Sequence, residues 1–518
     1  MAHWAAPVMA RQQMVLISSM LEQEIPPDHP VRLLDEILGG IDWSAWEAHY
    51  ESVRGQPPVH PRVLASAILY GLSLGLRSSR QLERACLSSI DFLWLVEKRD
   101  IDHSTFCKFR TQFSKELKGL FRQVGRIAMD MDLMRLNQVS LDGTKVAANS
   151  SRHGTARAAT LEQRLKCLDE QIEGMLAEAV AADGRDHQLW GEGTPNRLPR
   201  GLADLKSRQE RLGKALAAAR ARDAAAGPKA KPAAVPVADP DSAVAPNKHG
   251  GYSPNYTPML AVDGQAGLIV DAEVLADHDE SRAVLGAVER MEENFGRKPA
   301  QALADSAFGG GGNLSALAEG QVEAYIPLEH REDSEENPAR RSDPSQAIAP
   351  ALWEKLPVNR RTGRLSRMCF IYDAAADQYW CPMGKALTLV GSKSKPAHVA
   401  RQYRCQSCAG CPLATRCLGE KAQVRELERD VHEPLREAMD ARMRSEQGRN
   451  AYRRRSWMGE YAQGILKSVM GVRQFLLRGL VKVRTEWLWC CTAFNLRKLT
   501  RAVAARRAAP ASLATVQA

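Results

Sequence analysis

The stretch YRRRSWMGEYAQGILK, running from Tyr452 to Lys467, sets a single carboxylate, Glu460, within a strongly basic segment. Lys467 follows Glu460 by seven residues, so the two side chains share one face if the stretch is helical. Divalent metal ions prefer carboxylate oxygens, whereas a phosphate backbone is held by Arg and Lys. The mixture is typical of a site that holds both, although an ordinary surface helix with intrahelical ion pairs explains the same residues.

The basic character extends over the carboxyl-terminal part of the chain. Residues 442–507 hold 16 Lys and Arg against three acids, in a chain whose formal net charge is +10. The remaining residues are therefore close to neutral as a group. A basic region confined to one segment indicates a polyanionic partner.

Length and composition are typical of a multidomain globular protein. With 518 residues, 44% of them hydrophobic, we expect roughly two to four domains. No apolar run approaches the roughly 18 residues of a membrane span, and the start, MAHWAAPVMARQQ, lacks the apolar core of a signal peptide. We therefore expect a cytoplasmic protein with no membrane contact.

The order of the patterns predicts an α/β core that two insertions interrupt, preceded by an all-α domain. The predicted units are a helical DNA-binding domain (1–130), a first core segment (131–155), a coiled-coil-like helical insertion with a linker (156–250), a second core segment (251–320), a β-rich insertion with a cysteine cluster (321–425), a final core segment (426–507) and a disordered tail (508–518).

The amino-terminal domain shows apolar residues at helical intervals. The stretches are VRLLDEIL, the run from Pro61 to Leu76, SSRQLERACL, DFLWLV and, after a cap at Ser104, TFCKFRTQF. Basic side chains accompany them at Arg77, Arg80, Arg84, Lys108 and Arg110. These favour DNA binding through a helix-turn-helix-like arrangement, but a purely packing role fits the composition nearly as well.

The core segments alternate strand and helix, which is typical of an α/β domain. LNQVSLDGTK predicts a strand with Asp142 at its end. Thr257–Val262 and Leu268–Leu275 predict a hairpin, and a helix and the short strand QALAD follow, ending at Asp305. The glycine run from Gly309 to Gly312 lacks the GK[ST] of a phosphate loop, so we expect a mobile loop near the site.

The first insertion is predicted to be a helical hairpin. An apolar seam steps by four and three residues through Leu161, Leu165, Leu168, Ile172 and Met175. A returning helix is indicated by Leu202, Leu205, Leu212 and Leu216. The stretch AAAGPKAKPAAVPVADPDSAVAP that follows has the composition of a flexible linker.

The second insertion holds a cysteine cluster. Cys405, Cys408 and Cys411 are spaced by two residues, and Cys417 follows after five. In a reducing compartment such clustering favours a metal over disulfides, and four thiolates suffice for a structural Zn²⁺ site, with Cys381 as a fifth candidate. Unliganded core cysteines are the alternative, and an iron–sulfur cluster fits less well because the last spacing departs from its pattern.

One long helix is predicted near the carboxyl terminus. Its apolar stripe passes through Leu480, Val483, Trp487, Cys491 and Phe494, so it should pack on the core. Basic side chains are expected to face outward at Arg473, Arg478, Lys482 and Arg484.

Three acids define the expected site. Asp142 and Asp305 each end a strand, and Glu460 lies on a late helix. Three carboxylates that meet at one sheet edge can hold two divalent ions about 3.5 to 4 Å apart, one activating an attacking oxygen and the other stabilising a leaving oxygen. The pattern therefore indicates phosphodiester chemistry.

The order DGTK, then ADSAFGG, then Y-x7-E-x6-K followed by FLLRGL and NLRKL, resembles the DDE transposases of bacterial insertion sequences, most of all the family numbered eleven-eighty-two. GQPPVHPRVLASAILYG, SSRQLERAC and DHSTFCKFR are similar to that family's amino-terminal part, and the cysteine-bearing insertion is similar too. The resemblance implies a ribonuclease-H-like core, two Mg²⁺ or Mn²⁺ ions, and DNA strand cleavage and transfer at the ends of an element. It also implies a bacterial, nucleoid-associated protein that binds terminal inverted repeats and target DNA and dimerises when assembled on DNA.

By the same resemblance, the catalytic and metal-binding triad would be Asp142, Asp305 and Glu460. Tyr452, Arg455 and Lys467 would be the signature residues that contact DNA near the site. Four further basic residues of the same segment are expected to bind DNA as well: Arg453, Arg454, Arg473 and Arg478. Two departures affect Glu460: the preceding residue, Gly459, is usually more apolar, and EYAQG replaces an EPVFG-like run.

Two other functions fit parts of the sequence. A non-catalytic DNA-binding regulator or a decayed transposase would use the helical domain and the basic helix alone. A hydrolytic nuclease on the same core would nick DNA but would never join the freed 3′ end to a new target.

Overall fold

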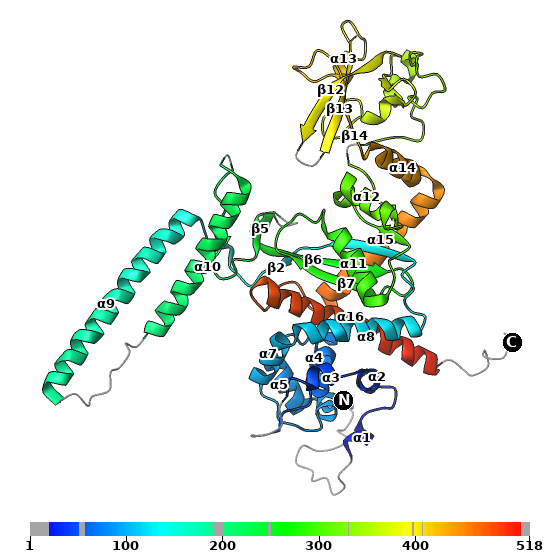
Figure 1. Cartoon of the computed structure of the whole chain (residues 1–518). Coiled ribbons are helices and arrows are strands. Elements are labelled where there is room, and N and C mark those ends of the chain that lie inside the picture. The colour runs from blue at the N-terminus through cyan, green and yellow to red at the C-terminus, as the bar shows by residue number, and fades with distance from the viewer. Residues whose placement is uncertain are drawn as a thin grey trace, which may run out of the picture.

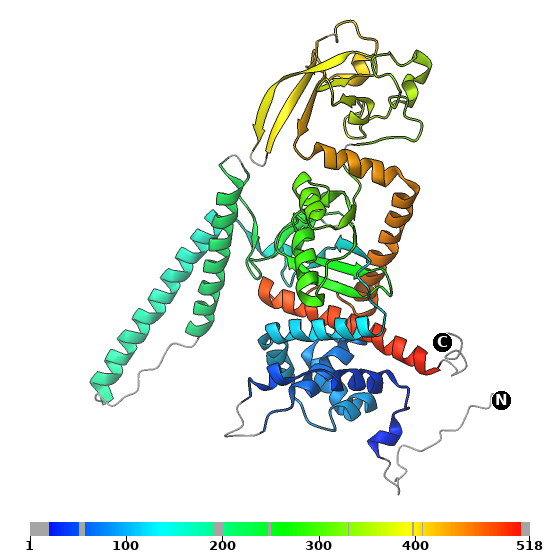
Figure 2. The same cartoon turned by 45° about the vertical axis from the view of Figure 1, so that its right-hand side comes forward.

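The computed structural model describes residues 20–508, except for 51–56, 191–200, 229, 247–249, 330, 396–397 and 407. A central sheet with its helices forms the middle of the molecule (Figure 1). The amino-terminal helices lie on one side of this body, the β-rich insertion lies at the opposite end, and a pair of long helices projects sideways (Figures 1 and 2).

The central sheet is mixed. In it β1 (Gln138–Gly143) pairs antiparallel with β6 (Tyr252–Asp263) and parallel with β8 (Gln301–Leu303). On one side β6 pairs with β7 (Ile269–Leu275), β2 (Val146–Ala147) and β5 (Ala243–Pro246); on the other side β8 pairs parallel with β9 (Glu323–Tyr325). The expected hairpin and both acid-bearing strands are thus confirmed, and the sheet changes from antiparallel to parallel pairing at β1.

Helices cover the sheet and bury its apolar side chains. The helix α11 (Ala283–Phe295) buries Val284, Val288, Met291 and Phe295 and ends at Gly296, which has a positive φ of 75°. The long helix α16 (Leu480–Ala508) packs on β7 and on the amino-terminal helices. Its expected apolar stripe is buried apart from Leu480, which is partly buried.

The amino-terminal domain is all-helical, as predicted. Its helices are α1 (Leu21–Glu24), α2 (Pro30–Gly39), α3 (Ser44–Glu47), α4 (Pro61–Ser73), α5 (Ser79–Ser88), α6 (Ile90–Leu95), α7 (His103–Gln112) and α8 (Ser114–Asp130). The expected cap at Ser104 is wrong by two residues: the Asp102 carboxylate caps α7 by accepting a 2.6 Å hydrogen bond from the Ser104 N–H.

The first insertion is a helical hairpin, α9 (Ala158–Trp190) and α10 (Leu202–Ala226), that extends away from the sheet (Figure 1). Leu161, Leu168 and Leu212 are buried between the helices, so the predicted seam is confirmed there.

The prediction of a flexible linker after this hairpin is only partly correct. β4 (Val235–Pro236) pairs with β3 (Thr155–Ala156), and β5 pairs with β6. The buried Asp239 carboxylate accepts hydrogen bonds from the Tyr256 hydroxyl at 2.8 Å and from the Gly479 N–H at 3.0 Å. These contacts with distant residues order a stretch whose composition alone is typical of a linker.

The second insertion is a five-stranded antiparallel sheet, β10 (Ile371–Asp373), β11 (Gln378–Trp380), β12 (Ala386–Lys395), β13 (His398–Cys405) and β14 (Glu426–Asp430). Its predicted bounds, 321–425, are displaced at both ends. β9 belongs to the central sheet because it pairs with β8, and β14 belongs to the insertion because it pairs with β13. Strand pairing over long sequence distances decides both boundaries.

The glycine run after Asp305 is not a loop throughout. A 3₁₀ turn, Ser306–Phe308, is followed by α12 (Gly311–Glu319), which starts inside the run. Gly311 is buried, and a Cβ there would lie 2.6 Å from the His432 side chain. Close packing, rather than mobility, therefore explains at least this glycine.

After β14, the predicted final core segment (426–507) continues with α14 (Glu433–Arg444) and α15 (Glu446–Gly464). A π-helical turn, Ile465–Val469, follows α15 directly. Of the expected tail, residues 509–518 lie outside the described part of the chain. Among the described helices, none combines the length and the apolar character that crossing a bilayer requires.

A buried ion pair joins the amino-terminal domain to the rest of the protein. Arg77 donates to the Glu486 carboxylate at 2.7 Å and to the carbonyl oxygens of Gly471 at 2.7 Å and Gln474 at 2.6 Å. Glu486 also accepts from the Leu477 N–H at 2.9 Å. Both side chains of the pair are nearly buried. Each charge has therefore lost most of its contact with water and is stabilised by the opposite charge of its partner.

We expect Arg77→Ala to destabilise the protein by about 2 to 4 kcal/mol, because it leaves a buried carboxylate and two carbonyl groups without their donor. Thermal unfolding of the full chain measures the effect as a lower midpoint. Arg80→Ala is the matched control, since Arg80 is exposed in the first turn of α5. Equal midpoints for the two variants would contradict the role of this ion pair.

Candidate functional site

Asp142 and Asp305 lie side by side at one edge of the sheet. β1 and β8 pair in parallel, with Ser140 opposite Leu303. Asp142 lies two residues after Ser140, and Asp305 lies two residues after Leu303. The Arg455 guanidinium lies between the two carboxylates, 2.8 Å from Asp142 Oδ1 and 3.9 Å from Asp305 Oδ2. The structure thus brings two of the three expected acids together with one expected basic residue.

One face of α15 is turned toward Asp142. Gln463 Nε2 donates to Asp142 Oδ2 at 2.8 Å. Gln463 lies one helical turn after Gly459 and two turns after Arg455. A Cβ at Gly459 would lie 3.2 Å from the same Asp142 oxygen. Arg455, Gly459 and Gln463, each four residues apart, therefore line the acid, and the glycine allows the helix to approach it closely.

The Asp142 carboxylate is partly withdrawn from water. Burial raises the pKa of Asp142 above its usual range; the Arg455 guanidinium opposes this rise, and the negative charge of Asp305 adds to it. Tyr452 lies on the same side of α15 with the Arg455 guanidinium 6.0 Å from its ring centroid, and burial raises the pKa of the Tyr452 hydroxyl. The site is therefore a charged, half-buried cluster at the protein surface.

Glu460 does not point at the two aspartates. It directly follows Gly459, so its backbone borders the site, but its side chain is exposed. Within the described residues it forms no hydrogen bond or ion pair. Successive helical residues are turned by about 100°, which explains why Gly459 rather than Glu460 faces Asp142.

The third carboxylate near the aspartates is Glu280, which the sequence analysis missed. It lies just before α11 and is half-buried. Burial and the negative charges of Asp305 and Asp142 together raise the pKa of Glu280 to about 7, against the opposing charges of Lys145 and Arg455. The run ADHDE before a helix was the available signal, but acids at a helix start usually serve the helix itself.

The other expected DNA contacts are distributed around this site. Arg453, Arg473 and Arg478 are exposed, and Arg454 is exposed while donating to the Gly264 carbonyl at 3.2 Å. Lys467 donates to the Thr144 hydroxyl and, at 3.1 Å, to the Lys145 carbonyl, so it lies beside the end of β1.

The donor set of the site fits a divalent metal ion, because carboxylate oxygens are the ligands that Mg²⁺ and Mn²⁺ prefer. Asp142 and Asp305 would hold it. The two aspartates do not, however, form a set with Glu460 or with Glu280 in which all ligand atoms lie within 4.8 Å of one another.

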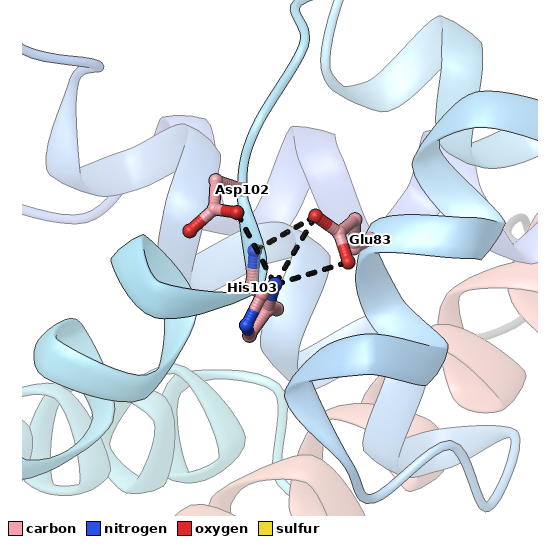
Figure 3. A group of neighbouring side chains, drawn as sticks. All are labelled: Glu83, Asp102 and His103. Atoms are coloured by element: carbon pink, nitrogen blue, oxygen red, sulfur yellow. Dashed lines mark hydrogen bonds and ion pairs between the residues drawn. The ribbon is translucent and has the colours of Figure 1, made fainter.

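One such compact set does occur in the described part of the chain, in the amino-terminal domain: Glu83, Asp102 and His103 (Figure 3). His103 Nδ1 lies 3.2 Å from a carboxylate oxygen of Glu83 and 3.2 Å from one of Asp102. Asp102 also caps α7, and Glu83 accepts from the His103 N–H at 3.2 Å. These mutual contacts, which fix the start of α7, explain the group without a metal.

The cysteine cluster lines a cavity of about 270 Å³ in the second insertion. Five thiols border it, those of Cys381, Cys405, Cys408, Cys411 and Cys417. A hydrogen bond from Cys405 lowers the pKa of Cys381 to about 6, and backbone N–H groups of Lys385 and Met383 act in the same direction. Burial raises the pKa of Cys417 to about 11. Cys381, the fifth candidate, therefore ionises more readily than Cys417.

Comparison with known protein families gives two matches. Residues 19–112 match a Transposase domain (DUF772), and residues 380–500 match a Transposase DDE domain. The second match includes the cysteine cavity, α15 and Glu460, whereas Asp142 and Asp305 lie before it. No curated protein was found that matches the chain.

The DDE domain implies a ribonuclease-H-like fold, a DNA partner and dependence on a divalent metal. The mixed sheet and its flanking helices agree with the α/β class expected from the sequence. A transposase domain in its amino-terminal part and a transposase DDE domain over its last strands and helices support a DDE-type insertion-sequence transposase.

Proposed function

We propose that this protein cleaves DNA at the ends of an insertion sequence and transfers the freed 3′-hydroxyl into target DNA. The observation that carries the proposal is the meeting of Asp142, Asp305 and Arg455 at one sheet edge, from three segments far apart in the chain. Acids and a guanidinium in one half-buried place suit a reaction centre that binds both metal and phosphate.

In the first step, water attacks a phosphodiester at the element's end and loses a proton, the bond between phosphorus and the 3′ oxygen breaks, and the 3′ oxygen takes up a proton and leaves as a 3′-hydroxyl. In the second step, that hydroxyl attacks a target phosphodiester and displaces another 3′-hydroxyl, with no covalent protein intermediate. Asp142 and Asp305 would hold the divalent ions, which would supply activation of the attacking oxygen and stabilisation of the leaving oxygen when bound.

The residues of this chain hold and orient the reactants. Asp142 and Asp305 would ligate Mg²⁺ or Mn²⁺, with Glu460 as the third acid of the family pattern after a change of side-chain rotamer. Gln463 fixes the Asp142 carboxylate by its hydrogen bond. Arg455 and Lys467 would balance phosphate charge.

The basic segment around the site would bind the DNA backbone. Arg453, Arg473 and Arg478 are exposed near α15 and the loop that follows it. Phosphate contacts of this kind position DNA without reading its sequence. Terminal repeats would be recognised by the amino-terminal helical domain, and two copies would assemble on DNA as a homodimer.

We expect Asp142→Ala and Asp305→Ala to abolish Mg²⁺-dependent nicking of a DNA fragment that carries the element's terminal repeats, because each removes a metal ligand. DNA binding should remain measurable by gel shift. Asp204→Asn, at an exposed position on α10, is the control and should nick like the wild type. Full nicking by either alanine variant would refute the assignment of the aspartates.

The same assay separates the alternatives. A regulator or a decayed transposase would bind the fragment without nicking it. A hydrolytic nuclease would nick but would not join the 3′ end to a labelled target.

We expect Arg453→Ala and Arg473→Ala each to weaken DNA binding about equally for specific and random fragments. The slope of log affinity against log salt concentration should fall by about 1 for each lost phosphate contact. Fluorescence anisotropy at several salt concentrations measures the slope. Arg361→Ala, in the second insertion, removes the same charge away from the proposed DNA surface and is the control. An equal slope for the wild type and the three variants would argue against the assigned DNA surface.

We also propose that the cysteine cavity holds one structural Zn²⁺. Four of its five thiols would supply the tetrahedral ligands, drawn from Cys405, Cys408, Cys411, Cys417 and Cys381. The cavity lies inside a small domain with its own apolar core, which a metal would help to order.

We expect about one zinc per chain in purified protein, measured by atomic emission. Cys405→Ser should lose the metal, because Cys405 lies at the end of β13 and borders the cavity. Comparison of Cys381→Ser with Cys417→Ser identifies which of these two thiols completes the set. Cys167→Ser, exposed on α9, should keep its zinc; a wild-type protein without zinc would overturn the proposal.

A further inference from the structure

We infer that a pocket at the base of the helical hairpin α9–α10 binds a phosphate group of the DNA backbone. This arginine pocket is lined by Arg164, Arg208 and Arg211 together with Ser150 and Ser151. The inference rests on the proposed function, because it extends the path of the same DNA beyond the two aspartates.

The arginine pocket has a volume of about 350 Å³ and lies where the hairpin joins the core (Figure 1). Arg164 comes from α9, and Arg208 and Arg211 come from α10. Ser150 and Ser151 come from the segment between β2 and β3. Guanidinium and hydroxyl groups donate hydrogen bonds to phosphate oxygens, and one arginine can form two parallel bonds to one phosphate. The lining therefore has the chemistry of a phosphate site.

The three arginines lack acidic partners in the part of the chain that the structure describes. None of the residues that line the pocket is acidic. The helix positions one turn from Arg164 and from Arg211 hold no Asp or Glu, and Asp204, one turn before Arg208, forms no ion pair with it. Arg208 and Arg211 are themselves one turn apart, where like charges repel. A bound anion would offset this repulsion.

A hydroxyl group without a partner borders the same pocket. The Ser150 Oγ atom is buried, and among the described residues it has no hydrogen-bond partner. Buried polar atoms usually form at least one hydrogen bond, and a serine hydroxyl can donate one to a phosphate oxygen. Ser150 thus provides a second, independent indication that the pocket takes a polar ligand.

The floor of the arginine pocket is apolar and fixed in place. Leu212, Val237 and Ala238 form it, and Leu212 is buried in the core of the hairpin. The Val237 N–H donates to the Gly154 carbonyl at 2.9 Å, next to the pairing of β3 with β4. The arginines of both helices therefore surround a floor whose position is set before any ligand binds.

Basic residues connect Asp142 with the arginine pocket. Three of them contact the intervening chain at successive points: Lys467 with the Lys145 carbonyl at 3.1 Å, the Arg473 carbonyl with the Ala147 N–H at 3.1 Å, and Arg478 with the Asn149 carbonyl at 2.8 Å. The next residue, Ser150, already lines the pocket. The residues proposed to bind DNA beside the aspartates thus continue without a break to the hairpin.

The length of this path sets which phosphate the pocket would meet. Ser150 follows Asp142 by eight residues, and eight extended residues span at most about 29 Å. Successive phosphates of one strand lie about 3.4 Å apart along the axis of duplex DNA. The contacted phosphate should therefore lie within about eight base pairs of the cut.

The test compares two double variants of the full chain, Arg164→Ala with Arg208→Ala, and Lys166→Ala with Lys206→Ala. Lys166 and Lys206 are exposed, and each lies two residues from the arginine of its helix, about 200° around the axis. The second variant therefore removes the same charge from the same two helices away from the pocket. Thermal unfolding shows whether each variant is folded.

Phosphate contacts are mapped by ethylation interference on terminal-repeat fragments that extend to both sides of the cut. We expect the wild type to show a contact within about eight base pairs of the cut that the arginine variant loses and the lysine variant keeps. Affinity of the arginine variant should fall about tenfold, the effect of losing a charged hydrogen bond. Its slope of log affinity against log salt concentration should fall by about 1.

Identical contacts in the wild type and the folded arginine variant would overturn the inference, and so would equal losses of affinity in the two double variants. Nicking is measured separately on the same proteins. A wild type that never nicks, but whose phosphate contact is lost in the arginine variant, would overturn the proposed function and leave the arginine pocket in place.

Discussion

The Arg455 guanidinium lies between two carboxylates that stand 163 residues apart in the chain, and the remainder of the site depends on this contact. Two like charges at the ends of neighbouring strands repel each other unless a cation lies between them. The arginine supplies that cation from α15, and Gln463 adds a hydrogen bond to Asp142. A divalent ion that binds here must share the carboxylates with Arg455 or displace it toward a phosphate.

The architecture brings these segments together without involving the insertions. β1 and β8 pair in parallel, so their aspartates meet at one edge, and α15 packs against β1 and β6. The helical hairpin and the β-rich sheet occupy the sequence between the acids and extend away from the site (Figures 1 and 2). The Arg77–Glu486 pair fixes the amino-terminal helices to α16, so the domain proposed to bind terminal repeats is held against the core.

Local patterns predicted much of this arrangement. Strand ends at Asp142 and Asp305, the stripe of α16 and the seam of the first insertion follow from periodicity and turn residues, which depend on near neighbours. Contacts between distant residues were not predictable in this way. They order part of the proline-rich linker, assign β9 and β14 to different sheets and start α12 within the glycine run.

The same dependence on contacts between distant residues explains which parts of the site the sequence did not predict. The sequence indicated that α15 carries an acid, but the face that meets Asp142 holds Gly459, because the helix approaches too closely for a larger side chain. Glu280 was missed because its position depends on the space beside Gly143, a contact across 137 residues.

The most direct test of the account is a crystal structure of the protein on a terminal-repeat DNA fragment with Mn²⁺, with the metal located by anomalous scattering. The account predicts a peak bounded by Asp142 and Asp305, with Arg455 turned toward a DNA phosphate. A peak confined to Glu83, Asp102 and His103, with Arg455 still between the two aspartates, would contradict it.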